Sequence, residues 1–405
     1  MRTRFWSYVR PSPRKLAIIL GLALAALVPL AAVAQITNWP EFQFGNDRLG
    51  FNPYEVVLKP SNVNNLGVLW QVNQGQQLIT VSPAVVNGIV YGVSFGEGRG
   101  VTNLFALNAQ TGATVWSRPL LGQFFLSAPT VSNGVLYVGL GLYLPYYTGA
   151  MYAFDARSGA LLWSNSAVNA IQTAPTVGNG AVYFGSDDGN IYALDASSGH
   201  QLWHYNTNTG QGAGSAGALV NGVFYIGLSS FVYALNASDG TLLWQYQLSS
   251  FIAASPAVQD GVVYISSYDG HVYALNASTG TLIWRQTLND LFFTSPSAAY
   301  GKIYVCGGEN GLTALDAQTG NVVWSYPTAQ CQYATPSVAN GVVYVGWQPS
   351  GTQNGHISAF DAMNGNLLWD YQPGSAVTAS SVVVNGVLFT PTYNGDVFAF
   401  SLNGH

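Results

Sequence analysis

The sequence predicts an all-β fold, an eight-bladed β-propeller of four-stranded antiparallel blades whose ring is closed by an N-terminal strand that completes the last blade. Three observations favour this fold. A unit of about 40 residues recurs along the chain, and each unit carries four strand signals separated by turns. Charged residues make up only 7% of the chain, while Gly reaches 46 residues. An unpaired strand signal precedes the first unit, and the last unit lacks its final strand.

The end of each unit is the easiest part to follow. A Gly four residues before a Trp recurs seven times, and the Trp residues are spaced by 47, 40, 41, 40, 40 and 45 residues. A period near 40 with four strands per repeat is typical of a propeller blade. The recurring pairs are Gly112/Trp116, Gly159/Trp163, Gly199/Trp203, Gly240/Trp244, Gly280/Trp284, Gly320/Trp324 and Gly365/Trp369.

The start of each unit is a small residue followed by Pro, and then a turn Gly. Eight such openings occur, with Gly217 and Ser381 at the Pro position in two of them, but only seven units end in Trp. The last unit stops near Ser401, and the segment 68–70, which ends in Trp70, has no unit of its own. We therefore expect this N-terminal segment to complete the last blade, which removes an exposed sheet edge.

The Trp residues are predicted to join neighbouring blades. A buried indole ring covers a large apolar area, and its N–H needs a hydrogen-bond acceptor. The turn Gly before each Trp supplies a positive φ angle. The predicted inter-blade residues are Trp70, Trp116, Trp163, Trp203, Trp244, Trp284, Trp324 and Trp369.

The first 34 residues resemble a secretory signal peptide. Five basic residues precede the apolar run 16–33, and Ala32-Val33-Ala34 fits a cleavage site. An uncleaved membrane anchor is the alternative, because the run is just long enough to span a bilayer. No Cys follows as a lipid-attachment site. We expect a periplasmic or extracellular protein with residues 35–405 as one propeller, of which 39–81 are leader and closing strand and 82–405 are repeats.

The charge balance excludes some partners. Without the N-terminal segment, seven basic residues remain against 17 acidic ones, and no basic cluster survives. Phosphate neutralisation requires grouped Lys and Arg, so nucleic-acid binding is not expected. Binding to an anionic membrane surface is disfavoured for the same reason. We expect a monomer with no membrane span after signal cleavage.

The repeat resembles the pyrroloquinoline quinone (PQQ)-type propeller repeat. The resemblance rests on the small-Pro-Ala-Val-x-Asn-Gly-Val-Val-Tyr-Val-Gly and Gly-x-Ile-Tyr-Ala-Leu-Asp-Ala-x-Thr-Gly-x-x-x-Trp patterns, and the leader 39–53 is also similar. It covers residues 39–405 and implies the fold. Relatives include quinoprotein alcohol dehydrogenases and the propeller subunit of the outer-membrane barrel assembly machinery, so the resemblance does not decide the function.

The chemistry of the dehydrogenases does not transfer to this chain. The resemblance would imply adjacent cysteines over the quinone, a calcium ion held by carboxylate and amide oxygens, and an Asp base. Cys306 and Cys331 are not adjacent, and the Asp-Gly and Asn-Gly pairs at 188–189, 269–270 and 394–395 fit hairpin turns. We therefore assign no catalytic residue and no metal ligand, and expect no cofactor. PQQ with calcium remains the alternative, at a site the sequence does not reveal.

The two cysteines fit a structural bridge. Cys306 ends the second strand of blade six, and Cys331 lies in the loop that leads into blade seven. An exported protein meets an oxidising compartment, so a disulfide between them is a reasonable expectation. Two buried free thiols are the alternative. The five His residues are scattered and suggest no metal site.

Aromatic residues gather in loops that share one rim. The hairpins 92–103, 139–150 and 346–355 are longer than the others and belong to neighbouring blades. Loops on a rigid scaffold often carry function, and an aromatic rim with few charges suits a protein or a neutral small molecule or glycan. The alternative is that these aromatics seal the loops onto the ring. The candidate rim residues are Phe95, Phe124, Phe125, Tyr143, Tyr146, Tyr147 and Trp347, to which Phe251, Phe292, Phe293 and Tyr333 of other inner loops are added.

These observations favour a non-catalytic binding or scaffold propeller that binds its partner at the aromatic rim. The alternative is a PQQ-dependent oxidoreductase, similar to an alcohol or sugar dehydrogenase, with a divergent site. A polysaccharide-binding or polysaccharide-degrading role is a third hypothesis, which rests on the aromatic residues alone.

Overall fold

A computed structural model describes residues 38–75, 77–96, 101–121, 124–142, 148–210, 214–288, 294–307, 310–331, 333–349, 352 and 354–404. The predicted signal peptide, residues 1–34, lies outside the described residues. Among the described residues the helical structure is a single 3-10 turn, η1 (Val63–Asn65). No described helix has the length and apolar character that crossing a bilayer requires.

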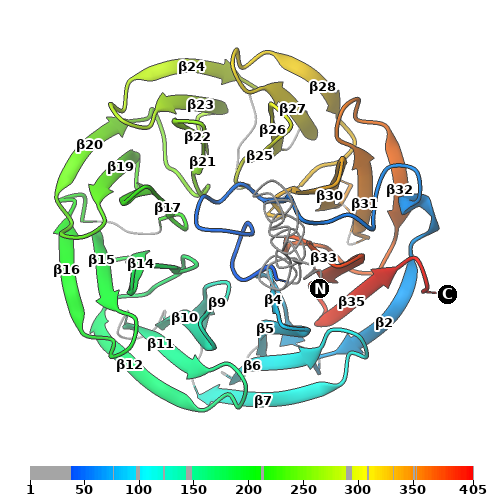
Figure 1. Ribbon diagram of the computed structural model, residues 1–405, viewed down its shortest axis with the longest axis horizontal. Coiled ribbons are helices and arrows are strands. Elements are labelled where there is room, and N and C mark those ends of the chain that lie inside the picture. The colour runs from blue at the N-terminus through cyan, green and yellow to red at the C-terminus, as the bar shows by residue number, and fades with distance from the viewer. Residues whose placement is uncertain are drawn as a thin grey trace, which may run out of the picture.

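Eight β-sheets stand around a central axis, so the eight-bladed propeller is confirmed (Figure 1). Blade 1 contains β4 (Ala84–Val86), β5 (Ile89–Gly96), β6 (Val101–Asn108) and β7 (Thr114–Leu121), with β3 (Gln77–Leu78) beside β5. Blade 2 contains β8 (Phe124–Leu126), β9 (Thr130–Ser132), β10 (Val135–Leu142), β11 (Gly149–Asp155) and β12 (Leu161–Val168).

The next three blades have four strands each. Blade 3 contains β13 (Thr176–Gly178), β14 (Ala181–Gly185), β15 (Asn190–Asp195) and β16 (Gln201–Asn206). Blade 4 contains β17 (Ala218–Val220), β18 (Val223–Leu228), β19 (Phe231–Asn236) and β20 (Leu242–Gln247). Blade 5 contains β21 (Ala257–Gln259), β22 (Val262–Ser267), β23 (His271–Asn276) and β24 (Leu282–Thr287).

The last three blades complete the ring. Blade 6 contains β25 (Ser297–Ala299), β26 (Lys302–Cys306), β27 (Leu312–Asp316) and β28 (Val322–Tyr326). Blade 7 contains β29 (Ser337–Ala339), β30 (Val342–Trp347), β31 (His356–Asp361) and β32 (Leu367–Tyr371), with β1 (Phe51–Asn52) beside β29. Blade 8 contains β33 (Val382–Val384), β34 (Val387–Pro391), β35 (Asp396–Ser401) and β2 (Gly67–Asn73).

The predicted ring closure is present in blade 8. Strand β2 pairs antiparallel with β35, with Val68 opposite Phe400 and Gln71 opposite Phe398. In Figure 1 the N-terminal strand forms the outer edge of a blade whose other strands come from the C-terminal end of the chain. The two ends of the propeller are therefore joined within one sheet.

A ring of Trp side chains joins each blade to the next. Each indole N–H donates to a backbone carbonyl of the following blade; Trp203, for example, bonds the carbonyl of Ala237 at 3.0 Å. The same contact recurs from Trp70, Trp116, Trp163, Trp244, Trp284, Trp324 and, across the closure, from Trp369 to Leu66. This uniform set of contacts is called the outer ring below.

The turn Gly of each blade is required by the outer ring as well as by its backbone. Gly240 has a φ of +73°, and a Cβ atom there would lie 2.6 Å from the ring of Trp203. The Gly-x-x-x-Trp pattern therefore reflects contacts with two neighbouring blades, because the Gly of one blade packs against the Trp of the preceding blade.

The leader, residues 39–52, runs across the centre of the ring along the inner strands (Figure 1). Its backbone bonds Val85 of blade 1, Val131 of blade 2, Leu219 of blade 4, Val258 of blade 5, Ala298 of blade 6 and Val338 of blade 7. The Asn52 side chain donates to the carbonyl of Val383 in blade 8. The leader is therefore an integral part of the channel.

Two of the long hairpins are strand extensions. In blade 1 the β5–β6 pairing continues to Phe95 opposite Thr102, and in blade 2 the β10–β11 pairing continues to Gly141 opposite Gly149. Strands β3 and β8 of the preceding loops pair with these extensions. The extra residues make the walls of blades 1 and 2 taller than those of the other blades.

Candidate functional site

The eight loops that lead into the innermost strands, here called the inner loops, surround a cavity of about 580 Å³ on the propeller axis. None of the described lining residues carries a charge. They are Phe42, Thr80, Val81, Ser82, Ala128, Gln172, Thr173, Ala174, Gly214, Ser215, Ala216, Phe251, Ala253, Ser255, Tyr268, Ser295, Tyr333, Thr335, Thr378, Ala379, Ser380 and Tyr393. The cavity is built from every blade.

One position of each inner loop forms a ring around this cavity, called the inner ring below. It is the small residue that precedes the Pro position, and its members are Ser82, Ala128, Ala174, Ala216, Ser255, Ser295, Thr335 and Ser380. Where the residue is Ser or Thr, its hydroxyl oxygen accepts the backbone N–H of the same position in the preceding blade. The five bonds run from Ala216 to Ser255, Ser255 to Ser295, Ser295 to Thr335, Thr335 to Ser380 and Ser380 to Ser82.

The inner ring is broken in blades 2, 3 and 4, where the residue is Ala. The N–H groups of Ser82, Ala128 and Ala174 each face one of these Ala positions, and no bond from them to a described residue is present. Ala128, Ala174 and Ala216 form a small apolar cluster with Phe42 and Val81. The cavity therefore has a hydroxyl sector in blades 5 to 8 and 1, and an alanine sector in blades 2 to 4.

The leader supplies the floor of the alanine sector. Phe42 lines the cavity, and its carbonyl accepts a hydrogen bond from the Arg48 guanidinium. Arg48 is fully buried and also donates to Gly217 at 2.9 Å and to Thr176 at 2.7 Å. These bonds fix the leader to blades 3 and 4, so that Arg48 positions the aromatic floor without contacting the cavity itself.

Arg48 also forms a buried ion pair with Glu41, at 3.1 Å between Nη2 and Oε2. Burial raises the pKa of Glu41 to about 7, and the positive charge of Arg48 opposes this only in part. Burial likewise lowers the pKa of Arg48. The pKa of Glu41 rises because the cost of burying its carboxylate exceeds the attraction of a single cation.

Aromatic side chains stand at the mouth of the cavity. Phe251 packs against Tyr268 with ring centroids 5.5 Å apart, and Tyr333 and Tyr393 are 53% and 37% exposed. Burial, with the nearby Tyr333, raises the pKa of Tyr268 to about 12, so its hydroxyl stays protonated in the physiological range. Tyr268 therefore adds an aromatic ring and no charge to the mouth.

Tyr268 and Tyr393 were not among the residues that the sequence predicted. Each precedes the Asx-Gly turn between the second and third strands, and its N–H bonds an inner loop, at Phe251 for Tyr268 and at Ala376 for Tyr393. Asp187 occupies the same place in blade 3 and bonds Ala170. Aligning the repeats at these turns would have revealed the position.

The predicted rim residues have different places. Phe251 and Tyr333 line the cavity. Phe95 is half-buried in β5 and packs against the core between blades 1 and 2. Tyr143, Tyr146, Tyr147, Phe292 and Phe293 lie outside the described residues, and Phe124 and Phe125 are described only as part of β8.

Trp347 is a core residue and not an exposed rim contact. It is 8% exposed, and its indole stacks on His356 with centroids 4.1 Å apart. Its N–H donates to the Ser358 hydroxyl at 2.8 Å. Strand β30 extends far enough to place Trp347 opposite His356 in the sheet, which directs the indole into the blade.

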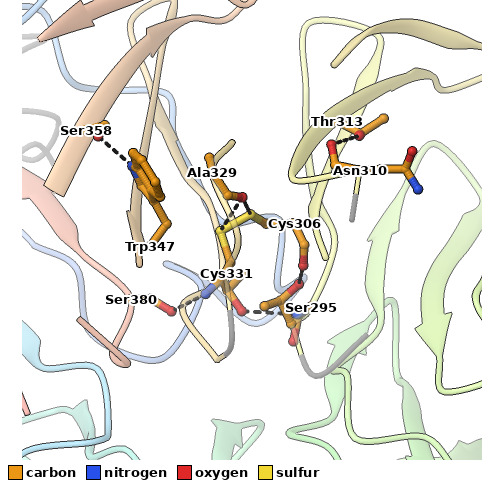
Figure 2. The surroundings of a disulfide bond; sticks show 11 residues. Ser295, Cys306, Asn310, Thr313, Ala329, Cys331, Trp347, Ser358 and Ser380 are labelled. Carbon is orange, nitrogen blue, oxygen red and sulfur yellow. Dashed lines mark hydrogen bonds between the residues drawn. A yellow bond between two sulfur atoms is a disulfide. The ribbon is translucent and has the colours of Figure 1, made fainter. Parts of the chain in front are cut away.

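Cys306 and Cys331 form a disulfide that joins β26 of blade 6 to the inner loop of blade 7 (Figure 2). Both residues are buried, and their Cα atoms are 5.5 Å apart. Figure 2 also places Ser295 and Ser380 of the inner ring beside the bridge. The disulfide thus holds the inner loop that carries Tyr333 and Thr335.

A calcium-bound PQQ does not fit the described lining of the cavity. A calcium site needs several carboxylate or amide oxygens, yet among the described lining residues Gln172 alone has such a group, whose amide N–H donates to Asp187 at 2.7 Å. Within the described part of the chain, no three His, Cys, Asp or Glu residues are grouped to hold a metal. The carboxylates of Asp188 and Asp269 bond the nearby Tyr192 and Tyr273 hydroxyls.

The family of the chain follows from its repeats. A family model described as outer membrane protein assembly factor BamB matches residues 62–141, 139–253 and 229–405. The chain belongs to this family of PQQ-like β-propellers. Its matches thus span nearly all of the propeller.

Individual relatives fall into two groups. Quinohemoprotein alcohol dehydrogenase ADH-IIG of Pseudomonas putida is 30% identical over 225 residues, which are 48% of this chain and 30% of the enzyme. BamB of Moranella endobia is 30% identical over 186 residues, which are 41% of this chain and 48% of that protein. The matched part of the chain is less than half the length of either relative.

The solved structures support the fold. Quinohemoprotein alcohol dehydrogenase from Comamonas testosteroni superposes with a TM-score of 0.75 at 16% identity, over 93% of this chain and 82% of that chain. At this identity the likeness concerns the architecture alone. Relatives of both groups leave the activity of this chain open.

Proposed function

We propose that the protein is an exported, non-catalytic binding propeller and that the cavity at the mouth of its central channel binds a neutral ligand. The observation that carries the proposal is the cavity itself, which is concave, built from all eight inner loops and lined by uncharged described residues. Pockets of this size and character are typical of small-molecule sites. Export is inferred from the N-terminal segment 1–34.

The concave shape favours a small molecule or the end of a chain over a flat protein surface. The leader provides the floor through Phe42, and aromatic side chains surround the opening. Loops positioned by a rigid scaffold are common places for binding residues. The Trp side chains of the outer ring are occupied by contacts with the next blade.

A cavity-filling variant tests the proposal. Ala253 lines the cavity and is half-buried, so Ala253→Trp places an indole in the opening, while Ala160→Trp puts the same group on an exposed turn as a control. We expect native mass spectrometry of protein purified from its own cells, or incubated with a cell extract, to find a bound small molecule. Ala253→Trp should lose the molecule and Ala160→Trp should keep it. Equal retention by both variants would exclude this cavity.

The alternative function is that of a PQQ-dependent oxidoreductase, and the quinohemoprotein relatives are the observation that favours it. Calorimetric titration of the purified protein with PQQ, with and without calcium, addresses it directly. We expect no saturable heat and no retained chromophore, because the described lining offers a single amide group where calcium needs several oxygen ligands. Binding at one site per chain, followed by dye-linked oxidation of an alcohol or sugar, would replace the binding proposal by the enzyme.

A further inference from the structure

We propose that the ligand of the cavity is a neutral sugar residue, held by the three unpaired N–H groups opposite the alanine positions and by the Thr378 hydroxyl. This inference rests on the proposed function, because it names the ligand class of the same cavity. The N–H groups belong to Ser82, Ala128 and Ala174, which follow one another in blades 1 to 3. Thr378 belongs to blade 8, the neighbour of blade 1.

The three N–H groups are backbone donors without an acceptor among the described residues. A buried backbone donor without an acceptor is unfavourable, and folded proteins leave few of them. Five members of the inner ring donate their N–H to a hydroxyl of the next blade. Blades 2 to 4 have Ala at this position and provide no such hydroxyl. Acceptor atoms from outside the chain would satisfy the three donors.

Thr378 lies outside the inner ring and supports the proposal separately. Thr378 is 8% exposed and lines the cavity, and its Oγ1 has no hydrogen-bond partner among the described residues. A hydroxyl both donates and accepts, so its partner needs the same capacity. The donors of blades 1 to 3 and the hydroxyl of blade 8 form one continuous arc around the axis.

The lining of the cavity restricts the chemistry of the ligand. Its acceptors must reach several donors along an arc, one of its groups must exchange hydrogen bonds with a hydroxyl, and an apolar face must cover Ala128, Ala174 and Phe42. A sugar ring combines adjacent hydroxyls with an apolar C–H face, which suits these groups and the aromatic mouth. Charge is disfavoured, because the described lining offers no ion partner and a buried unpaired charge is costly.

The experiment titrates the full chain with neutral sugars and their charged counterparts. The probes are methyl α-glucoside, N-acetylglucosamine, maltose and cellobiose, with glucuronate and glucosamine as the charged forms. We expect at least one neutral probe to saturate one site, and its charged counterpart to bind at least about tenfold more weakly. Tighter binding of a disaccharide than of its monosaccharide would identify the end of a glycan as the ligand. Failure of every neutral probe to bind would overturn the inference.

Two variants separate the proposed contacts from folding. Thr378→Val keeps the shape of the side chain and removes a hydroxyl that has no described partner, so the melting temperature should not fall while sugar affinity falls about tenfold. Ala128→Ser with Ala174→Ser supplies the hydroxyls found elsewhere in the inner ring and should have the same effect on affinity. Thr114→Val makes the same change on an exposed outer strand, away from the cavity, and should bind as the wild type does. Unchanged affinity in the first two variants would overturn the inference.

A measurement on the wild type avoids any variant that fails to fold. Addition of the sugar should slow amide hydrogen exchange at Ser82, Ala128 and Ala174 more than at Ser255 or Ser295, whose N–H groups are already bonded. Equal protection in both sectors would contradict the assignment. If a non-carbohydrate is displaced by Ala253→Trp, this inference fails and the proposed function stands; if no ligand is displaced, both fail.

Discussion

The outer and inner rings of the propeller differ in how uniformly their inter-blade hydrogen bonds repeat. All eight Trp side chains of the outer ring make one contact, an indole N–H bonded to a carbonyl of the next blade. The inner ring repeats a hydroxyl-to-amide bond in five blades and replaces it by Ala in three consecutive ones. The outer ring is therefore uniform, whereas the inner ring divides into the hydroxyl sector and the alanine sector on which our binding proposal rests.

Loss of an outer-ring Trp is expected to have the largest effect. Trp203→Ala removes an 8% exposed side chain that fills the space against Gly240 and bonds Ala237. It should lower the free energy of unfolding by about 3–5 kcal/mol. Urea denaturation followed by Trp fluorescence and circular dichroism measures this change. An unchanged urea midpoint for Trp203→Ala would mean that the outer-ring contact does not stabilise the fold.

Removal of the disulfide should have the next largest effect. Cys306 and Cys331 are 25 residues apart, and closing a loop of this length restricts the unfolded chain by about 3 kcal/mol. Cys306→Ala with Cys331→Ala, unfolded in the same buffer as the wild type, should show this loss. Thiol counting in denaturant without reductant is the control, and two free thiols in the wild-type protein would contradict the bridge.

The buried Glu41 should make stability depend on pH, although the outer ring contains no titrating group. Its pKa rises from 4.5 in the unfolded chain to about 7 in the folded protein, so the folded state holds more protons between these values. The free energy of unfolding should therefore fall by up to roughly 3 kcal/mol as the pH rises through this window. Burial also raises the pKa of Asp47, which acts in the same direction.

Glu41→Gln is the control for this pH dependence, because the amide keeps the shape of the side chain and does not titrate. The variant should lose most of the slope between pH 4.5 and about 7. Denaturation midpoints at several pH values in one buffer system give the comparison. A wild-type slope of the opposite sign would mean that Arg48 stabilises the carboxylate more than burial destabilises it.

The smallest effect is expected within the inner ring. Ser295→Ala leaves the N–H of Ser255 without its acceptor at 2.8 Å and should cost about 1–2 kcal/mol. Ala128→Ser makes the reverse change in the alanine sector and should leave the melting temperature the same or slightly higher. A large loss from Ala128→Ser would mean that no room exists beside the N–H of Ser82, and the sector would then be a packing feature.

The outer part of the fold could be predicted from the sequence because its contacts repeat. The Trp period of about 40 residues and the missing last strand were enough to place β2 in blade 8, and the pairing of Val68 with Phe400 confirms it. The turn Gly was predicted from its backbone alone. Its close approach to the Trp of the preceding blade became visible only when the blades were placed side by side.

The inner part was predicted less well, since its contacts cross between blades and involve residues that look alike. Ser and Ala both satisfy a small-residue position, so the change between them was not recognised as a change in hydrogen bonding. Trp347 was expected on the rim, but it lies within β30, opposite His356, and its indole stacks on that residue. The path of the leader through the channel depends on contacts with most blades and has no local signal.

The closure of blade 8 also imposes an order on folding. The N-terminal strand β2 is synthesised before any repeat, but its partner β35 is the last of the described strands, and the bond from Trp369 to Leu66 spans 303 residues. Contacts so far apart in sequence slow folding, because the chain must be brought together before they stabilise it. Until β35 is available, β2 has no sheet partner of its own, and an unpaired strand edge can pair with another chain.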